Sequence, residues 1–220
     1  RIRREERIRD RLYRFFSPAV VETIIKGGHR LGGVQVEATI LFADIRGFTP
    51  MVEDLRPDYT VELLNQFLSA MTEEVFKEDG TLDKYIGDCV MAVFGAPIAH
   101  PDDPLRAIRT GLGMKERVKE INESWRERGF FEELKIGIGI NTGKVLAGNI
   151  GSEKRMDYTV ISDAVNLASR LEGVAEPDQI IISEATYLRV KDRVRANRLE
   201  PVRVQGKREP VPIYEVIGLK

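Results

Sequence analysis

The stretch VQVEATILFADIRGFTP, residues 34–50, indicates both the fold and the first chemistry of this 220-residue chain. Residues 34–43 are rich in β-branched and other apolar side chains, which predicts a strand. The strand gives way to a turn at Asp44, because Gly47 and Pro50 disfavour a continued strand. The stretch therefore places a carboxylate at the point where a predicted strand ends.

Helices and strands alternate in the rest of the chain. Apolar side chains at helical spacing predict two long helices, and short β-branched runs predict strands. Two such runs are separated only by Gly87-Asp88, which is typical of a type II′ hairpin. Thr142-Gly143 is interpreted as the joint between two further strands. The predicted helices are 59–76, 104–125, 163–171 and 184–190, and the predicted strands after the first are 81–86, 89–94, 134–141, 144–150, 158–161, 179–182, 194–205 and 211–217.

The order of these elements predicts the fold class. Strand, helix, hairpin, helix, strand over residues 34 to about 150 is the β-α-β-β-α-β order of ferredoxin-like folds. We therefore predict an α+β domain in which helices cover one face of an antiparallel sheet. The last 70 residues would extend the sheet and add helices, and the last two strands would pair antiparallel. The predicted domain spans 34–220 and follows a connector over 1–33.

The connector is predicted to be helical. A narrow apolar seam at helical spacing runs among arginines, as in a short coiled-coil seam. Ser17-Pro18 is typical of the start of a second short helix, over 19–26. Because the chain begins with Arg rather than Met, we expect it to be the output end of a longer protein with an upstream regulatory domain. The seam consists of Ile8, Leu12 and Phe15.

Charge is distributed unevenly along the chain. It has 34 Lys plus Arg against 35 Asp plus Glu, a formal net charge of −1, but residues 1–30 alone carry +5 and the remainder −6. A near-zero total argues against a nucleic-acid binder, which would carry a basic excess. The N-terminal arginines are interpreted as a solvated helix face, with a membrane or phosphate patch as the alternative.

Cysteine content and hydropathy indicate the compartment. The single cysteine, Cys89, excludes an internal disulfide and is interpreted as a small apolar core residue. No apolar run approaches the roughly 18 residues that span a bilayer, and no signal peptide is visible. The expected protein is soluble and cytoplasmic.

Two carboxylates are predicted to lie side by side. Asp44 ends the first strand and Asp88 is at the tip of the hairpin, and these strands are sheet neighbours in the predicted fold. Paired carboxylates repel each other unless a proton or a cation lies between them. Hard oxygen ligands beside a phosphate-bearing substrate suit Mg²⁺ or Mn²⁺. The alternative is two ordinary turn aspartates.

The turn after Asp44 has the features of a weak phosphate site. Gly47, Phe48 and Thr49 lead toward a long helix, and free backbone N–H groups at such a junction bind anions. The chain contains no P-loop motif, so the turn by itself does not identify a nucleotide site.

Four motifs resemble the catalytic domain of the class III nucleotidyl cyclases. They occur in the family's order and spacing, and the resemblance covers roughly residues 34–217. It implies a ferredoxin-like core with extensions, and two chains that pair head to tail so that each active site forms between them. The motifs are ILFADIRGFT (40–49), LDKYIGDCVMAVFGAP (82–97), IGIGINTGKVLAGNIGS (136–152) and YTVISDAVNLASRLE (158–172).

The resemblance implies an adenylyl cyclase, a homodimer that converts ATP to 3′,5′-cyclic AMP and pyrophosphate. Asp44, Asp88 and the backbone carbonyl of Ile45 would hold two Mg²⁺ or Mn²⁺ ions. These ions would bind the triphosphate and lower the pKa of the ribose 3′-hydroxyl, which attacks the α-phosphate. Backbone amides around Phe48 and Thr49 would hold the distal phosphates.

The second chain would supply the remaining residues. Lys84 and Thr159 match the family's base-recognising positions, and an ammonium and a hydroxyl suit N1 and N6 of adenine. Guanine presents the opposite pattern, so Lys84 would oppose its N1–H at a cost of about 1–3 kcal/mol. Asn166 and Arg170 share one helix face. They would orient the ribose and stabilise the transition state.

Two positions depart from the family's pattern. The family often has Lys-Gly-Lys near its end, whereas this chain has Gln205-Gly206-Lys207. We therefore expect Arg155 to contact phosphate, with Lys207 or Lys154 also able to compensate. Ser162 replaces a frequent glycine and is expected to restrain the loop into the catalytic helix. A guanylyl cyclase, or a nucleotide-sensing or dimerisation module without turnover, are the alternative functions.

Overall fold

The computed structural model describes residues 13, 18–25, 32–53, 55–130, 132–152, 154–204, 207 and 209–220. The predicted seam helix at the N-terminus and Gln205 lie outside these residues. The second short helix of the connector is present, one residue earlier than predicted. The elements are α2 (Pro18–Ile25), β1 (Gly32–Ile45), α3 (Phe48–Glu53), α4 (Pro57–Lys77), β2 (Thr81–Ile86), β3 (Cys89–Phe94), α5 (Asp103–Glu127), β4 (Ile136–Ser152), β5 (Arg155–Ile161), α6 (Asp163–Val174), β6 (Ile180–Ser183), α7 (Glu184–Val190), β7 (Val194–Arg198) and β8 (Ile213–Leu219).

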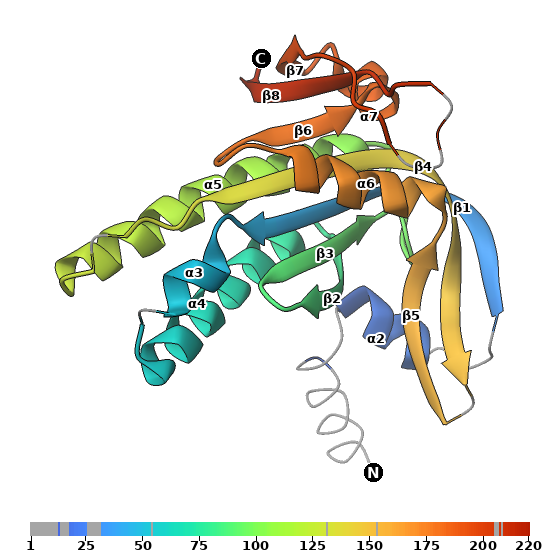
Figure 1. Cartoon of the computed structure of the whole chain (residues 1–220). Helices are drawn as coiled ribbons and strands as arrows, with labels where there is room; N and C mark the ends of the chain where they lie inside the picture. The colour runs from blue at the N-terminus through green and yellow to red at the C-terminus, as the bar shows by residue number, and fades with distance from the viewer. Residues whose placement is uncertain are drawn as a thin grey trace.

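The strands form one sheet with the order β2-β3-β1-β4-β6-β8-β7, and β5 pairs with β4 outside this path. β1 lies between β3 and β4 and is antiparallel to both. The first four strands, with α4 and α5 in their connections, have the predicted ferredoxin-like arrangement. The C-terminal strands extend the sheet beyond β4, also as predicted. In Figure 1 the β4–β5 hairpin forms an arm that projects from the body of the domain.

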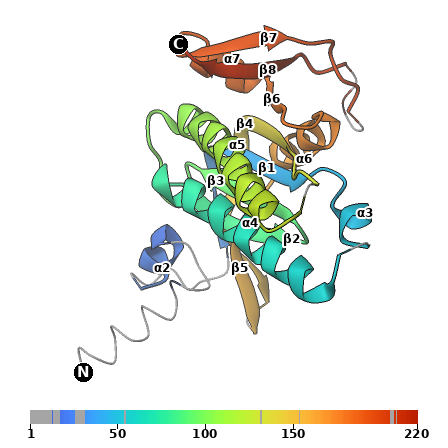
Figure 2. The same ribbon diagram turned by 90° about the vertical axis from the view of Figure 1, so that its left-hand side faces the viewer.

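Helices cover both faces of the sheet. α4 and α5 lie side by side on one face, and α6 crosses the opposite face (Figures 1 and 2). Leu41 and Ala43 of β1 pack with the α4 and α5 layer, whereas Ile40 and Phe42 pack with α6. This alternation follows the two-residue period of a strand. The prediction that helices cover only one face of the sheet is thus wrong, because α6 covers the other face. Since β1 is buried on both faces, its sequence is a nearly continuous apolar run.

The predicted break between residues 141 and 144 is wrong. β4 runs without interruption through Thr142 and Gly143, which pair with Thr39 and Ala38 of β1. The hydroxyl oxygens of Thr39 and Thr142 are 2.9 Å apart. Gly143 is needed for close packing rather than for a turn, because a Cβ there would come within 2.9 Å of the side chain of Ala164 on α6.

Other element bounds differ in smaller ways. The segment after Gly47 was expected to be a turn, but it forms the short helix α3, in which Pro50 occupies an early position that tolerates proline. α6 continues through Gly173, and β7 ends well before residue 205. β2, β3 and α7 have the predicted bounds. Gly87 has a φ of 64°, while Asp88 is not among the described residues with positive φ, as a type II′ hairpin requires.

None of the helices in the described part of the chain combines the length and apolarity that a membrane-spanning segment needs.

Two glycines of β4 allow other groups to approach the sheet. A Cβ on Gly137 would overlap the guanidinium of Arg46, and a Cβ on Gly139 would overlap the backbone nitrogen of Glu172 on α6. Both glycines alternate with Ile136, Ile138 and Ile140, which are fully buried on the opposite face. The IGIGI pattern therefore combines a packed face toward α5 with a bare face on which α6 lies directly.

We expect Gly139→Ala to destabilise the domain by about 3 kcal/mol, the upper end for overpacking, because backbone rather than a mobile side chain blocks the added methyl group. Gly173→Ala is the matched control, since a Cβ there meets no atom within 4 Å and Gly173 lies within α6. It should raise stability by up to about 1 kcal/mol. Denaturant unfolding of both variants measures the difference, and equal effects would contradict the packing role of Gly139.

Candidate active site

The carboxyl groups of Asp44 and Asp88 lie close together at the end of β1. Asp44 pairs with Gly137 near the end of the β1–β4 ladder, and Asp88 is at the tip of the adjacent hairpin. Burial is the largest cause that raises the pKa of Asp44 to about 7, followed by a hydrogen bond and charge repulsion from Asp88. Glu172 also raises this pKa, and Arg46 opposes the rise. The predicted adjacency of the two aspartates is confirmed.

This pair fits a divalent cation that arrives together with a ligand. Two carboxylates that compete for one proton offer hard oxygen atoms at a single point. In the described part of the chain, no group of three or more His, Cys, Asp or Glu side chains could hold a metal ion alone. Mg²⁺ is commonly bound by one or two carboxylates plus substrate phosphates. The donor set therefore suits Mg²⁺ or Mn²⁺ bound with a phosphate-bearing molecule.

Arg46 ties this turn to the end of α6, and sequence analysis missed it. Its guanidinium donates to the backbone oxygens of Ala175, at 3.0 Å, and of Glu172. It also forms an ion pair with the Glu172 carboxylate at 2.5 Å and lies 3.9 Å from that of Asp44. The last carbonyls of a helix lack partners within the helix, so Arg46 both caps α6 and holds the turn. The sequence feature that could have indicated this contact is Gly137, because the absence of a side chain there leaves room for the Arg46 guanidinium.

α6 presents Asn166 and Arg170 outward. The Ser162 hydroxyl accepts hydrogen bonds from the backbone N–H groups of Ala164 and Val165, at 3.0 and 3.4 Å, so it caps the helix. The restraint of the preceding loop stays a prediction. Asn166 and Arg170 are exposed one turn apart. Neither side chain bonds another residue in the described part of the chain, so both are available to a ligand or a second chain.

Lys84 and Thr159 meet across β2 and β5 through a residue that sequence analysis missed. The Thr159 hydroxyl donates to Oδ2 of Asp83 at 2.7 Å, and the Lys84 ammonium is 3.3 Å from Oδ1 of the same carboxylate. Burial raises the pKa of Asp83, and the Thr159 hydrogen bond and the Lys84 charge oppose this rise. A regular strand would point adjacent residues to opposite faces, so the sequence offered no reason to join Asp83 to Lys84.

The proposed phosphate contacts are not gathered at one point of a single chain. Phe48 packs against the core at the start of α3, and Thr49 is exposed beside it. Arg155 is exposed at the tip of the β4–β5 arm, where it pairs with Ser152, fifteen residues along β4 from the partner of Asp44. Lys207 is exposed in the segment between β7 and β8. Arg155 and the aspartate pair thus lie at opposite ends of β4.

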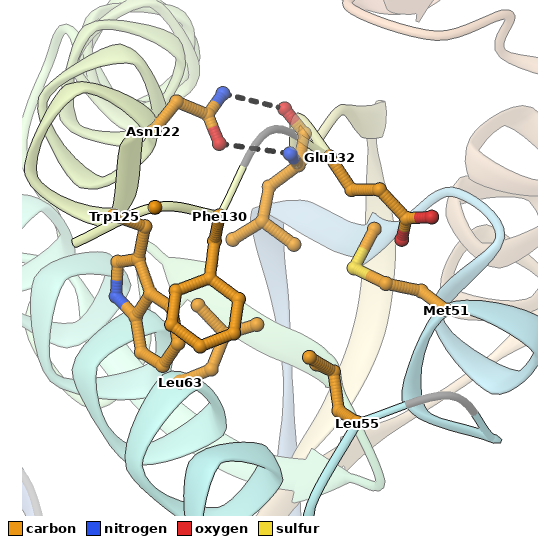
Figure 3. A pocket seen from close by; sticks show the side chains of 9 residues that line it. Met51, Leu55, Leu63, Asn122, Trp125, Phe130 and Glu132 are labelled. Carbon is orange, nitrogen blue, oxygen red and sulfur yellow. Dashed lines mark hydrogen bonds between the residues drawn. The ribbon is translucent and has the colours of Figure 1, made fainter. Parts of the chain in front are cut away.

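A cavity of about 300 Å³ lies between α3 and the α4 and α5 layer (Figure 3). Met51 and Leu55 from the α3 side face Leu63, Trp125 and Phe130 across it. The Asn122 side chain closes one end by exchanging two hydrogen bonds with the backbone of Leu134, each 2.8 Å long. Neither Asp44 nor Asp88 lines the cavity. α3 is therefore held by apolar packing that leaves some free volume beneath it.

Cys89 has a packing role, as predicted, and so does Trp125. Cys89 packs in the core layer under α6, and burial, with a smaller effect of Asp44, raises the pKa of its thiol to about 12. Trp125 is buried, and its indole nitrogen donates to Gln66 at 2.6 Å. At neutral pH the thiol of Cys89 is therefore not a nucleophile.

A family model described as the adenylate and guanylate cyclase catalytic domain matches residues 34–218. Adenylate cyclase 1 of Rhizobium meliloti is 33% identical over 220 residues, which cover 97% of this chain and 33% of that protein. The chain thus spans about a third of the length of this curated relative.

Two solved structures resemble the domain closely. The adenylyl cyclase CyaB from P. aeruginosa is 40% identical with a TM-score of 0.83, covering 85% of this chain and 96% of that one. The guanylyl cyclase Cya2 is also 40% identical, with a TM-score of 0.82 over 86% of this chain and 96% of that one. Because an adenylyl and a guanylyl cyclase match equally well, similarity alone does not distinguish the purine base.

We expect Asp88→Asn to stabilise the metal-free domain at pH 8 by about 1–2 kcal/mol, after allowance for solvent screening at a partly exposed pair. The folded domain holds a proton on Asp44 more tightly than the unfolded chain, since the pKa is raised from 3.8 to about 7. Stability is therefore lost as pH rises between these values.

Thermal unfolding with a chelator, between pH 5.5 and 8.5, measures this difference. The gain in the variant should shrink toward pH 5.5, and Mn²⁺ should stabilise only the wild type. A variant that is less stable at every pH would contradict the assigned repulsion between the two carboxylates.

Proposed function

Because the chain belongs to the adenylate and guanylate cyclase catalytic-domain family, we propose that it is an adenylyl cyclase that converts ATP to 3′,5′-cyclic AMP and pyrophosphate. The observation that carries this proposal is the meeting of Lys84 and Thr159 at one point. An ammonium can donate to adenine N1, and a hydroxyl can accept from the N6 amino group. Guanine would place its own N1–H against the Lys84 ammonium, which leaves two donors opposed.

The aspartate pair supports a metal-dependent reaction. Asp44, Asp88 and the backbone carbonyl of Ile45 would hold two Mg²⁺ or Mn²⁺ ions, and the closeness of the two carboxylates supports this assignment. When bound, these cations would neutralise phosphate charge and lower the pKa of the ribose 3′-hydroxyl.

The other residues would bind and orient the nucleotide. Asn166 would hold the ribose so that its 3′-hydroxyl faces the α-phosphorus in line with the departing pyrophosphate. Arg170 would stabilise the charge that develops on the α-phosphate. Backbone amides at Phe48 and Thr49 would hold the distal phosphates, with Arg155 and Lys207 as additional cations.

A head-to-tail homodimer would complete each site. Asn166 and Arg170 face away from the core of their own chain, and Arg155 lies far along β4 from the aspartate pair. In a symmetric pair, the aspartates of one copy would meet the base-recognising and transition-state residues of the other. Each dimer would then contain two equivalent sites.

The first 33 residues would connect the catalytic domain to a regulatory domain. A curated adenylate cyclase matches almost the whole of this chain, but the chain spans only about a third of that protein's length. An upstream sensor that acts through this connector is consistent with that difference in size. Its activating signal would come from outside the catalytic domain.

A nucleotide assay tests the substrate. With Mn²⁺ or Mg²⁺, we expect kcat/KM for ATP to exceed that for GTP by about tenfold or more, because one mismatched donor pair costs at least about 1 kcal/mol. Cyclic nucleotide formation is measured for both substrates with both metals. Equal or better use of GTP would contradict the adenine assignment, and ATP binding without product would favour a sensing module.

A mixing experiment tests the shared site. Asp44→Ala and Arg170→Ala should each lower kcat by about 10²–10³ when purified alone. Mixed in equal amounts, they should recover about one quarter of wild-type activity, since half of the dimers would be mixed and each would contain one intact site. Failure to recover activity in verified mixed dimers would exclude a site shared in this way.

A further inference from the structure

We propose that Asp83 fixes the direction of the Thr159 hydroxyl and thereby sets the preference for a 6-aminopurine nucleotide over a 6-oxopurine nucleotide. The inference rests on the proposed adenylyl cyclase function and concerns how its base is selected. Asp83 contacts the recognition residues rather than the substrate, so it is a positioning residue.

A threonine hydroxyl alone does not separate the two classes of base. It carries one proton and two lone pairs, and it rotates to suit its partner. Turned one way it accepts from the amino group at position 6 of adenine, and turned the other way it donates to the oxygen at position 6 of guanine or hypoxanthine. Selectivity at Thr159 therefore requires a neighbour that engages the hydroxyl proton.

Asp83 is placed to be that neighbour. The Thr159 hydroxyl donates to Oδ2 of Asp83 at 2.7 Å, a length typical of a hydrogen bond to a charged carboxylate. The Asp83 side chain is only 3% exposed, so water does not compete for this bond. With its proton engaged, Thr159 has only lone pairs left for the substrate. It can then accept from an amino group but cannot donate to a carbonyl oxygen.

The same carboxylate holds the second recognition residue. Oδ1 of Asp83 is buried without a hydrogen-bond partner in the described part of the chain, and the Lys84 ammonium is 3.3 Å from it. An unsatisfied buried carboxylate oxygen favours a nearby cation. The Lys84 side chain is 42% exposed, so its ammonium remains accessible to a base.

A β-bulge makes this arrangement possible. The register between β2 and β3 shifts between Leu82 and Lys84, which makes Asp83 the extra residue of the strand. In a regular strand, Asp83 and Lys84 would point to opposite faces. A bulge redirects one side chain, so both neighbours reach the same point.

The test is Asp83→Asn, assayed with ATP and with inosine triphosphate, which has an oxygen at position 6. An asparagine amide can donate to Thr159 and release the hydroxyl proton toward the substrate. We expect the ratio of kcat/KM for inosine triphosphate to that for ATP to rise at least about fivefold, with an unchanged dependence on Mn²⁺ concentration. An unchanged ratio in a folded, active variant would overturn the proposal.

Two comparisons separate positioning from a general structural effect. Asp192→Asn makes the same charge change at an exposed turn residue and should leave the ratio as in the wild type. In a Thr159→Val background, Asp83→Asn should change the ratio much less, because only its contact with Lys84 remains. A similar rise without the hydroxyl would overturn the role of Asp83.

A measurement on the wild type covers the case in which Asp83→Asn does not fold. Purine riboside triphosphate keeps N1 but lacks the 6-amino group, so a fixed acceptor at Thr159 should lower its kcat/KM at least about fivefold relative to ATP. Equal turnover of the two would overturn the proposal. A wild type that converts none of these nucleotides would contradict the proposed function and this inference with it, whereas an ATP preference that is insensitive to Asp83 would contradict this inference alone.

Discussion

The antiparallel pairing of β1 with β4 is the constraint on which the rest of the domain depends. The ladder is continuous from the Gly32–Asn149 pair to the Ile45–Ile136 pair, and residues 38–43 of β1 are buried on both faces. A one-residue slip would exchange the side chains that face α6 with those that face α4 and α5. Both faces are packed, so the register is strongly specified. Asp44 is therefore held at a defined point beside the β2–β3 hairpin.

The same ladder determines where α6 can lie. Bare glycine backbone at Gly139 lets α6 approach the sheet more closely than any side chain would allow. Arg46, which follows β1 directly, then bonds the last turn of that helix through Glu172 and Ala175. The turn that bears Asp44 and the helix that bears Arg170 are thus linked by hydrogen bonds and an ion pair. Movement of α6 would disturb the charges that surround Asp44.

The proposed binding of a nucleotide must depend on local charge rather than on the net charge of the domain. Outside the first 30 residues the chain sums to −6, which opposes a polyanionic substrate at long range. The buried Asp83 adds a negative charge next to the proposed base site, and such a charge is tolerated only when it is paired and hydrogen-bonded. Its partners are Lys84 and Thr159. The presence of a buried carboxylate at Asp83 is therefore explained by its contacts with Lys84 and Thr159, and not by attraction of the substrate.

Structure formed by residues close together in the sequence could be predicted, and so could one contact between distant residues, that of Asp44 with Asp88. Gly87 and the β-branched runs on either side of it were enough to predict the β2–β3 hairpin. Because this hairpin lies beside β1 in a ferredoxin-like fold, the prediction also placed Asp88 next to Asp44. Thr142-Gly143 misled the prediction, because a local turn signal was overridden by a continuous ladder and by the approach of α6.

Patterns of propensity and spacing along the chain thus determined the order of elements, the fold class and the aspartate pair. The tertiary structure alone decided that Arg46 meets Glu172 and that Asp83 meets Thr159, across 126 and 76 residues of sequence. No periodicity links residues at such separations. Their contacts arise because a bulge, a bare glycine and a closely packed helix bring polar groups from distant parts of the chain together.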